Sequence, residues 1–275
     1  MKYCGRYSNK IDMKVFDEIS ILYDRQDEQL LDFLEKYKDH HIILNIQSLH
    51  IEDFIKYQEW KKLNYIQEKF PDYNFSVCFK ESCRFEEAPG PLQQAIKELK
   101  VPFFTGDVVT NFDQLHYLLN LGVSQVYLGE DICFDLRRVK HVCDGYYVKL
   151  RAFPNVAQSC IKTTPPLKKF FIRPEDVEEY GEIIDVLEFW GPLSRQEILH
   201  RIYSRGVWFG DLKEIILDLN LSFDSRRIIP GFAQARKVCE RKCMKGRRCD
   251  ICENIYSISE KLEDKGLIIK HKKNY

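Results

Sequence analysis

The sequence predicts an α/β fold, a compact or distorted TIM-type (β/α)8 barrel with a small Cys-rich C-terminal extension. Short apolar runs alternate with amphipathic stretches through roughly the first two hundred of the 275 residues, and eight such runs stand out. Strands that alternate with helices must pair in parallel, and parallel strands need both faces covered. An open doubly wound sheet is the structural alternative.

Each predicted strand is a short apolar run bounded by turn or helix signals. The eight predicted strands are 18–23, 41–46, 74–79, 101–104, 124–128, 145–150, 170–172 and 183–189. The helices predicted between and after them are 27–38, 51–70, 90–100, 111–120, 132–139, one starting at 173–176, and 195–204.

Several of these helices carry start signals. Pro91 lies in a first turn, where its missing N–H costs nothing. Asn111 can cap the helix that follows it. Pro174 and the two acidic residues after it favour another helix start. Ser194 and Glu197 have the spacing of a capping box.

The connection between the sixth and seventh predicted strands, 152–169, carries no clear helix and contains three prolines. A long irregular connection inside a compact domain is either functional or evidence against the assignment, and we take it as functional. The predicted strands and helices span about 190 residues, near the lower end of the ~200 to 400 that this fold uses.

Near residue 205 the alternation of apolar runs and amphipathic stretches ends, and a segment rich in turn residues and cysteines begins. We therefore expect a barrel domain over 1–205 and a Cys-rich metal- or cluster-binding segment over 206–275. Within the second segment, a short helix is predicted at 212–219 and a last helix at 253–264, followed by a basic tail that favours a short strand.

The overall charge excludes a strongly basic nucleic-acid protein, because 42 Lys+Arg balance 42 Asp+Glu. The sequence contains no run of 18 apolar residues, which argues against a membrane span. The N-terminus lacks the apolar stretch of a signal peptide. We therefore expect a protein of the reducing cytoplasm, without a membrane partner. Disulfides are improbable there, so clustered cysteines indicate metal and scattered ones core packing.

Four of the ten cysteines fall within fourteen residues: Cys239, Cys243, Cys249 and Cys252. Four thiolates on a short turn-rich segment can converge on one centre, and soft thiolate ligands select zinc or an iron–sulfur cluster. The spacing suits a structural zinc and a [4Fe–4S] cluster equally well.

Between Arg236 and Asp250, seven basic and two acidic residues leave a local excess of +5. These cations either lower the thiol pKa values and offset the charge of a four-thiolate site, or contact nucleic-acid phosphate.

Polar residues follow the predicted strands, at the end of a barrel where working residues lie. They are Asp24, Gln47, Lys80, Asp107, Glu130, Arg151, Asn155, Arg173 and Glu188. Arg151 and Arg173 are the strongest candidates for binding an anionic substrate, because arginine holds carboxylate or phosphate at two points. We add Asn155 as a substrate-binding candidate, and Asp107 and Glu188 join the two arginines as catalytic candidates.

Cys160 stands apart from the other scattered cysteines, because it lies in the irregular connection at the predicted mouth. It is a candidate cluster ligand, a nucleophile or a packed thiol. Cys78, Cys83, Cys133 and Cys143 are read as core residues. The chain has no Gly-rich phosphate loop, no G-x-S-x-G elbow and no H-E-x-x-H motif.

Several short motifs resemble the collagenase-like peptidase family (family U, number thirty-two). They are FFTGDVVTNFDQL at 103–115, LGVSQVYLGED at 121–131, KLRAFPN at 149–155 leading into Cys160, FIRPED at 171–176 and IIDVLEF at 183–189. The resemblance covers roughly residues 40 to 190. It implies a TIM-type barrel, and several family members are linked to hydroxylation of RNA bases or quinone precursors, some with a four-cysteine [4Fe–4S] cluster.

The cysteines depart from the family pattern. In the family the first cysteine follows strand six, as Cys160 does here, and the others are dispersed after it, whereas four sit together in this chain. The ligands are then either all four C-terminal cysteines or Cys160 with three of them, and zinc remains an alternative to iron–sulfur.

The leading hypothesis is thus an iron–sulfur barrel protein that modifies RNA or a small aromatic substrate, with an electron donor or partner protein. The runner-up is a non-enzymatic, zinc-stabilised protein that binds nucleic acid or serves as a scaffold. Peptide hydrolysis is a third alternative.

Overall fold

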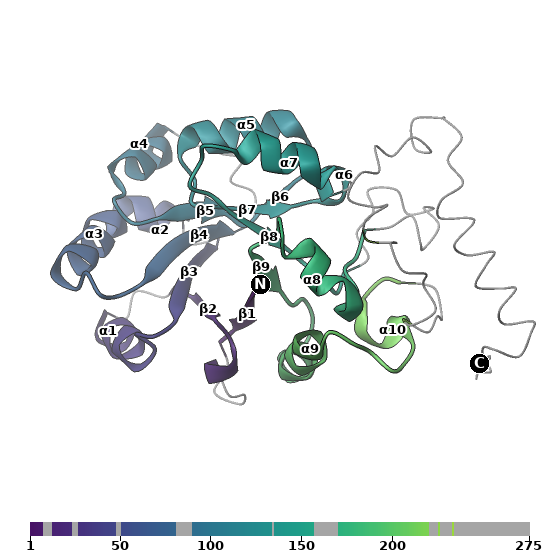
Figure 1. The fold of residues 1–275 in the computed structure, drawn as a ribbon. Helices are drawn as coiled ribbons and strands as arrows, with labels where there is room; N and C mark the ends of the chain where they lie inside the picture. Colours follow the sequence, from purple (N-terminus) through teal and green to yellow (C-terminus); the bar gives the residue numbers. More distant parts are fainter. Residues whose placement is uncertain are drawn as a thin grey trace, which may run out of the picture.

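The computed structural model describes residues 1–7, 13–23, 27–47, 51–80, 90–133, 135–156 and 170–219, together with Ser225 and Ala233. A nine-stranded parallel sheet curls into a half-barrel, with helices around its outer side (Figure 1). The predicted α/β class with a barrel-like parallel sheet is therefore confirmed.

All strand pairs in the sheet are parallel, and the order is β5-β4-β3-β2-β1-β9-β8-β7-β6. The strands are β1 Lys2–Arg6, β2 Glu18–Leu22, β3 His41–Gln47, β4 Phe75–Lys80, β5 Phe103–Thr105, β6 Val108–Val109, β7 Gln125–Leu128, β8 Lys149–Ala152 and β9 Val186–Glu188.

The sequence analysis missed two strands, β1 and β6, and assigned one strand that the sheet does not contain. The first strand of the sheet, β1, was not predicted, because its sequence KYCGR has no apolar run. It nevertheless lies at the centre of the sheet, between β2 and β9. Conversely, 170–172 is not a strand of the sheet, although Phe170, Phe171 and Ile172 are all buried. This run is apolar because its side chains are buried in the core, and not because it pairs within the sheet.

The fourth predicted strand, 101–104, corresponds to β5, whereas β6 was not predicted, and Gly106 and Asp107 lie between the two. Strand β5 pairs with β4, whereas β6 pairs with β7. The backbone N–H of Ser124 also donates to the carbonyl of Phe103 at 2.8 Å, next to the start of β7. Strands β5 and β6, which are adjacent in the sequence, are therefore the two end strands of the sheet order.

The helices mostly follow the predicted pattern. They are α1 Asp27–Lys36, α2 Ile51–Lys56, α3 Glu59–Lys69, α4 Gly90–Glu98, α5 Phe112–Leu121, α6 Glu130–Cys133, α7 Leu136–Cys143, α8 Val177–Tyr180, α9 Leu193–Arg205 and α10 Leu212–Ile215, with 3-10 turns η1 Met13–Val15 and η4 Pro174–Asp176. The predicted helix 51–70 is interrupted at Gln58, whose φ of 53° is left-handed. Asn111 caps α5 as predicted, since its side chain accepts from the Gln114 N–H at 2.8 Å.

The predicted capping box at Ser194 was wrong. The cap of α9 is Pro192, and Ser194 lies inside the helix. Proline fixes the φ of the cap residue, so the helix begins two residues earlier than the box predicts. The predicted helix 253–264 and the strand in the basic tail lie outside the described residues.

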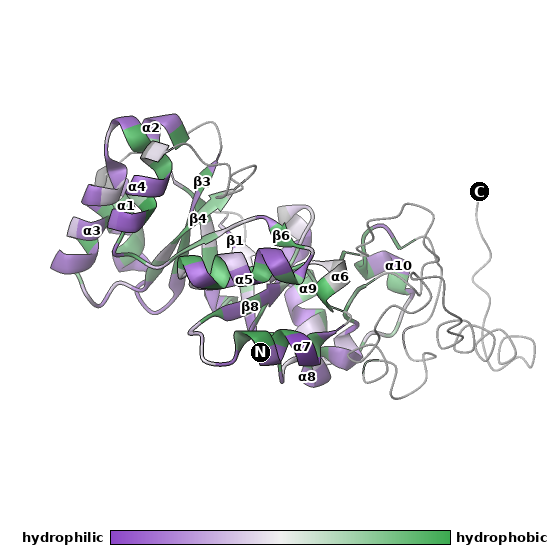
Figure 2. Cartoon of the chain, turned by 90° about the horizontal axis from the view of Figure 1, so that it is seen from above, coloured by the Kyte–Doolittle hydropathy of each residue, from purple (hydrophilic) through white to green (hydrophobic). Residues whose placement is uncertain are grey.

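Apolar side chains of the sheet and the covering helices form one hydrophobic core. Helices such as α5 and α7 carry both apolar and polar segments, as amphipathic surface helices do (Figure 2). The described residues after the predicted domain boundary join this core, because Leu212 and Ile215 of α10 are buried in it. Among the described residues, no helix is both long and apolar enough to cross a membrane.

Candidate functional site

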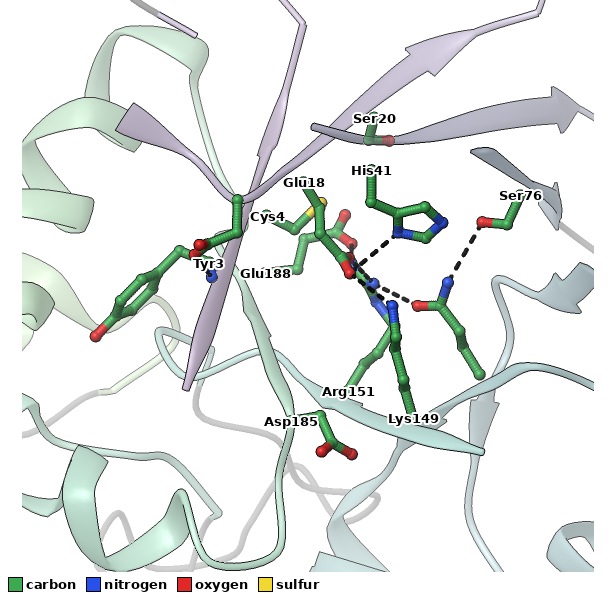
Figure 3. A network of polar contacts seen from close by, with 12 residues as sticks. Tyr3, Cys4, Glu18, Ser20, His41, Ser76, Lys149, Arg151, Asp185 and Glu188 are labelled. Atoms are coloured by element: carbon green, nitrogen blue, oxygen red, sulfur yellow. Dashed lines mark hydrogen bonds and ion pairs between the residues drawn. The ribbon is translucent and has the colours of Figure 1, made fainter. Parts of the chain in front are cut away.

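The inner face of the curved sheet carries polar side chains as well as apolar ones. Residues paired in register on parallel strands point to the same face, so the register identifies this set. Its buried polar members near the middle of the sheet are Glu18, His41, Ser76, Gln125, Arg151 and Glu188. They form one connected network (Figure 3).

Arg151 of β8 is the centre of this network and is fully buried. Its Nη1 donates to a carboxylate oxygen of Glu18 and, at 2.6 Å, to the side-chain oxygen of Gln125. Its Nη2 donates to Glu188 Oε2 at 3.1 Å. The guanidinium thus joins β2, β7 and β9 through charge-assisted hydrogen bonds.

Aromatic rings enclose the same guanidinium. It lies 5.2 Å from the ring centroid of Tyr127 and 5.7 Å from that of Phe104. The Tyr127 hydroxyl donates to Glu188 Oε2, and burial raises the pKa of this phenol well above its usual range. The phenol therefore stays protonated and acts as a hydrogen-bond donor inside the sheet.

Glu18 also contacts the first residue of β3 and the first residue of β8. His41 Nδ1 donates to Glu18 Oε1 at 3.1 Å, and Lys149 Nζ lies 3.4 Å from the same oxygen. Burial alone would raise the pKa of Glu18, but the hydrogen bond from His41 and the charge of Arg151 outweigh it and lower the pKa. Burial lowers the pKa of His41, which favours the neutral imidazole, although the contact with Glu18 acts in the opposite direction.

These contacts place two predicted site residues together but in the interior. Arg151 and Glu188 were predicted at the mouth as candidates for substrate binding and catalysis. Both are buried, and their charged atoms already contact protein groups. In this structure the two side chains link neighbouring strands of the sheet, and other protein groups already compensate their charges.

The second predicted arginine, Arg173, lies elsewhere and is also engaged. Its Nε and Nη2 each donate at 2.6 Å to the carboxylate of Asp176. Its Nη1 donates to the backbone carbonyl of Ser225 at 2.8 Å. Arg173 is buried, and it ties Ser225 to the start of η4.

Asn155 was predicted as a substrate-binding residue, and the structure places it beneath Trp190. Its Nδ2 donates to the Trp190 carbonyl at 2.6 Å, and its Oδ1 accepts from the Trp190 N–H at 2.9 Å. Asn155 itself is buried. The amide therefore fixes the backbone that carries the indole.

A ladder of aromatic rings connects the network to this indole. The rings of Tyr127 and Phe153 stack at 5.0 Å with 6° between their planes. Phe153 in turn meets Trp190 edge-on at 5.5 Å. Trp190 lies two residues after the end of β9 and is 46% exposed, so the ladder runs from the core to the surface at the carboxyl end of the sheet. The guanidinium of Arg6 lies 4.5 Å from the indole centroid.

Asp107, the remaining catalytic candidate, lies in the turn between β5 and β6. It is partly exposed, and its backbone N–H donates to Thr105 Oγ1 at 3.1 Å. Asp107 therefore lies apart from the network around Arg151, in a turn at the end of the sheet order.

The predicted ligands Cys239, Cys243, Cys249, Cys252 and Cys160 lie outside the described residues, as do Asp24 and Cys83. Within the described part of the chain, no three His, Cys, Asp or Glu side chains form a group that could hold a metal ion. Cys78 and Cys133 are buried, as predicted for core residues, and Cys143 is partly buried.

Sequence reasoning missed Arg6 and Trp190. Arg6 ends a strand that was not predicted, so it was absent from the strand-end residues. Trp190 follows the last predicted strand directly, and an aromatic residue at this position was the signal that could have identified it.

Comparisons with known proteins leave the family unassigned. No family model matches the chain, and no curated protein matches it. Among solved structures, it is similar to a cube-shaped, highly porous protein cage designed by fusing symmetric oligomeric domains, with 11% identity and a TM-score of 0.40. That match covers 99% of this chain and 87% of the other. The function is therefore inferred from the residues and contacts described above.

Proposed function

We propose that this chain is an iron–sulfur barrel protein, related to the collagenase-like peptidase family, that carries out a hydroxylation-type modification of an RNA base or a small aromatic substrate. The observation that carries the substrate class is the aromatic ladder. Stacked rings end in a half-exposed indole at the carboxyl end of the sheet, and aromatic faces bind flat rings by stacking.

The proposal includes a closed (β/α)8 barrel. Counting β5 and β6 as two halves of one strand leaves eight strands, and those halves pair with β4 and β7. The Ser124 N–H to Phe103 carbonyl bond supports contact between the β5 and β7 ends. In such a barrel the carboxyl ends of the strands form the working face, which is where Trp190 lies.

The cofactor assignment depends on donor chemistry. Cys239, Cys243, Cys249 and Cys252 would hold a [4Fe–4S] cluster, with Cys160 as the substitute for one of them. Four soft thiolates fit this group, and seven nearby cations would offset its negative charge. When bound, such a cluster supplies one-electron transfer. The described residues contribute the binding face, through Trp190 and its support Asn155.

Anaerobic purification tests the cofactor. The protein is expected to be brown, with an absorbance band near ~400 nm that dithionite bleaches, and Cys249→Ser with Cys252→Ser should remove the band. The matched control is Cys133→Ser, a buried core thiol far along the chain from the quartet. A colourless protein that carries one zinc per chain would reject the iron–sulfur assignment.

A second candidate function has one specific observation in its favour, the +5 charge excess between Arg236 and Asp250. In that case a Cys4 zinc site orders a basic module that binds nucleic acid. Binding would weaken steeply with salt, and Arg247→Glu with Arg248→Glu would abolish it. Binding of RNA that does not change with salt would exclude this function.

A further inference from the structure

Arg6 differs from the two arginines that the sequence singled out. The guanidinium groups of Arg151 and Arg173 each donate to carboxylate or carbonyl oxygens, whereas the Arg6 guanidinium has no hydrogen-bond acceptor and no ion-pair partner among the described residues. Its Nε is buried, and the residue as a whole is only partly exposed. A partly desolvated cation without an anion is costly, and a ligand anion removes that cost.

The side chain of Gln196 contacts the backbone of Arg6 and carries a second donor. This residue of α9 is fully buried, and its Oε1 accepts from the Arg6 backbone N–H at 2.8 Å. That bond sets the orientation of the amide, because an N–H donates only to the oxygen. The Gln196 Nε2 is then a buried donor with no acceptor among the described residues. Among the described residues, Nε of the Arg6 cation and Nε2 of Gln196 are thus two buried N–H donors without an acceptor.

The neighbouring indole is held in place from below. Asn155 bonds both the N–H and the carbonyl of Trp190, and Phe153 packs on its ring. Arg6 lies over the indole at 4.5 Å, which orients the guanidinium as well. A positioned cation beside a half-exposed aromatic ring is a preorganised site for a ligand that has both a ring and a negative charge.

We propose that Arg6, Gln196 and Trp190 form an anion-binding subsite, in which Arg6 and Gln196 donate to a carboxylate or phosphate and Trp190 packs against the attached planar ring. This inference rests on the proposed function for the identity of the ring as substrate. Arginine binds both anions at two points. An aromatic carboxylate and a nucleotide phosphate are the two sources of this chemistry.

Titration calorimetry with four probes distinguishes these sources. The anionic probes are 4-hydroxybenzoate and uridine 5′-monophosphate, and their neutral counterparts are 4-hydroxybenzyl alcohol and uridine. We expect one anionic probe to bind at least about 10-fold more tightly than its neutral counterpart, with Arg6→Gln removing that advantage and Arg6→Lys retaining part of it. Trp190→Leu should weaken both members of the preferred pair.

The matched control is Arg138→Gln, because Arg138 also lies over an aromatic ring, Phe112 at 4.0 Å, but on the exposed surface of α7. It should bind the probes as the wild type does, and circular dichroism checks that each variant is folded. Equal binding of anionic and neutral probes, or an unchanged preference in Arg6→Gln, would overturn the subsite.

Iron content measured on the same samples separates this inference from the proposed function. Arg6-dependent binding by a protein without iron keeps the subsite and removes the iron–sulfur assignment. A brown protein with no preference for an anionic probe removes the subsite alone.

Discussion

Arg151 and Glu188 face each other across neighbouring strands, with guanidinium Nη2 donating to carboxylate Oε2 over 3.1 Å, and neither side chain is more than 1% exposed. Glu18 meets the same guanidinium from the other side. Two carboxylates are therefore neutralised by one buried arginine and by Lys149 at the rim. The arrangement indicates a structural role for a pair of residues that resemble a substrate clamp in the sequence.

Replacing Arg151 by Met should destabilise the protein by about 3–5 kcal/mol, because it leaves two buried carboxylates without their shared cation. Urea denaturation measures the change. Adding Glu18→Gln and Glu188→Gln to this variant should recover part of the loss, since no uncompensated charge then remains. A single Arg151→Met variant as stable as the wild type would contradict the structural role.

Tyr127→Phe should cost about 1–3 kcal/mol, because it removes the hydroxyl that donates to buried Glu188. Thermal and urea unfolding are the measurements. Tyr65→Phe is the matched control, since Tyr65 is 58% exposed on α3 and its loss of a hydroxyl should change little. Equal effects of the two substitutions would argue against the Tyr127–Glu188 bond.

Stability should fall as the pH is lowered from about 7.5 to 5.5, and His41 should contribute to this slope. Burial lowers the pKa of His41 in the folded protein, so the unfolded chain, with its ordinary pKa near ~6.5, binds the proton first. Glu18, whose pKa is also lowered, loses its stabilising effect only below its ordinary value near ~4.3. The two contributions therefore occupy different pH ranges.

Unfolding free energies of His41→Gln against pH test this. The slope between pH 7.5 and 5.5 should become shallower than in the wild type. His116→Gln, at an exposed position of α5, is the control and should leave the slope as it is. A His41→Gln variant with the wild-type slope would show that His41 is not held neutral by burial.

Asn155→Ala should loosen Trp190, because the two hydrogen bonds that fix its backbone are lost. In a chain with Trp60→Phe and Trp208→Phe, Trp190 emission reports this, and we expect a red shift and stronger acrylamide quenching. The matched control is Asn64→Ala, which also removes an amide bonded to two backbone groups, but far along the chain. A quenching rate that responds equally to both substitutions would contradict the role of Asn155 in fixing the Trp190 backbone.

The alternating apolar runs were sufficient to predict the parallel sheet, since seven of its strands coincide with such runs. Strand β1 was not recognised in the sequence, because its inward-facing residues Cys4 and Arg6 do not form an apolar run. These positions are determined by the pairing of β1 with β2 and β9. The site was harder to predict, because it depends on where each strand ends. Strand β8 ends at Ala152, two residues later than predicted, so Arg151 lies within the strand and not after its end at the expected mouth.

Iron and acid-labile sulfide, quantified per chain in anaerobically purified protein, test the proposed function most directly. We predict about four of each per chain, no stoichiometric zinc, and loss of both when Cys239 and Cys243 are replaced by Ser. A chain that holds zinc at these cysteines, or retains its iron after all four are replaced, would contradict the proposal.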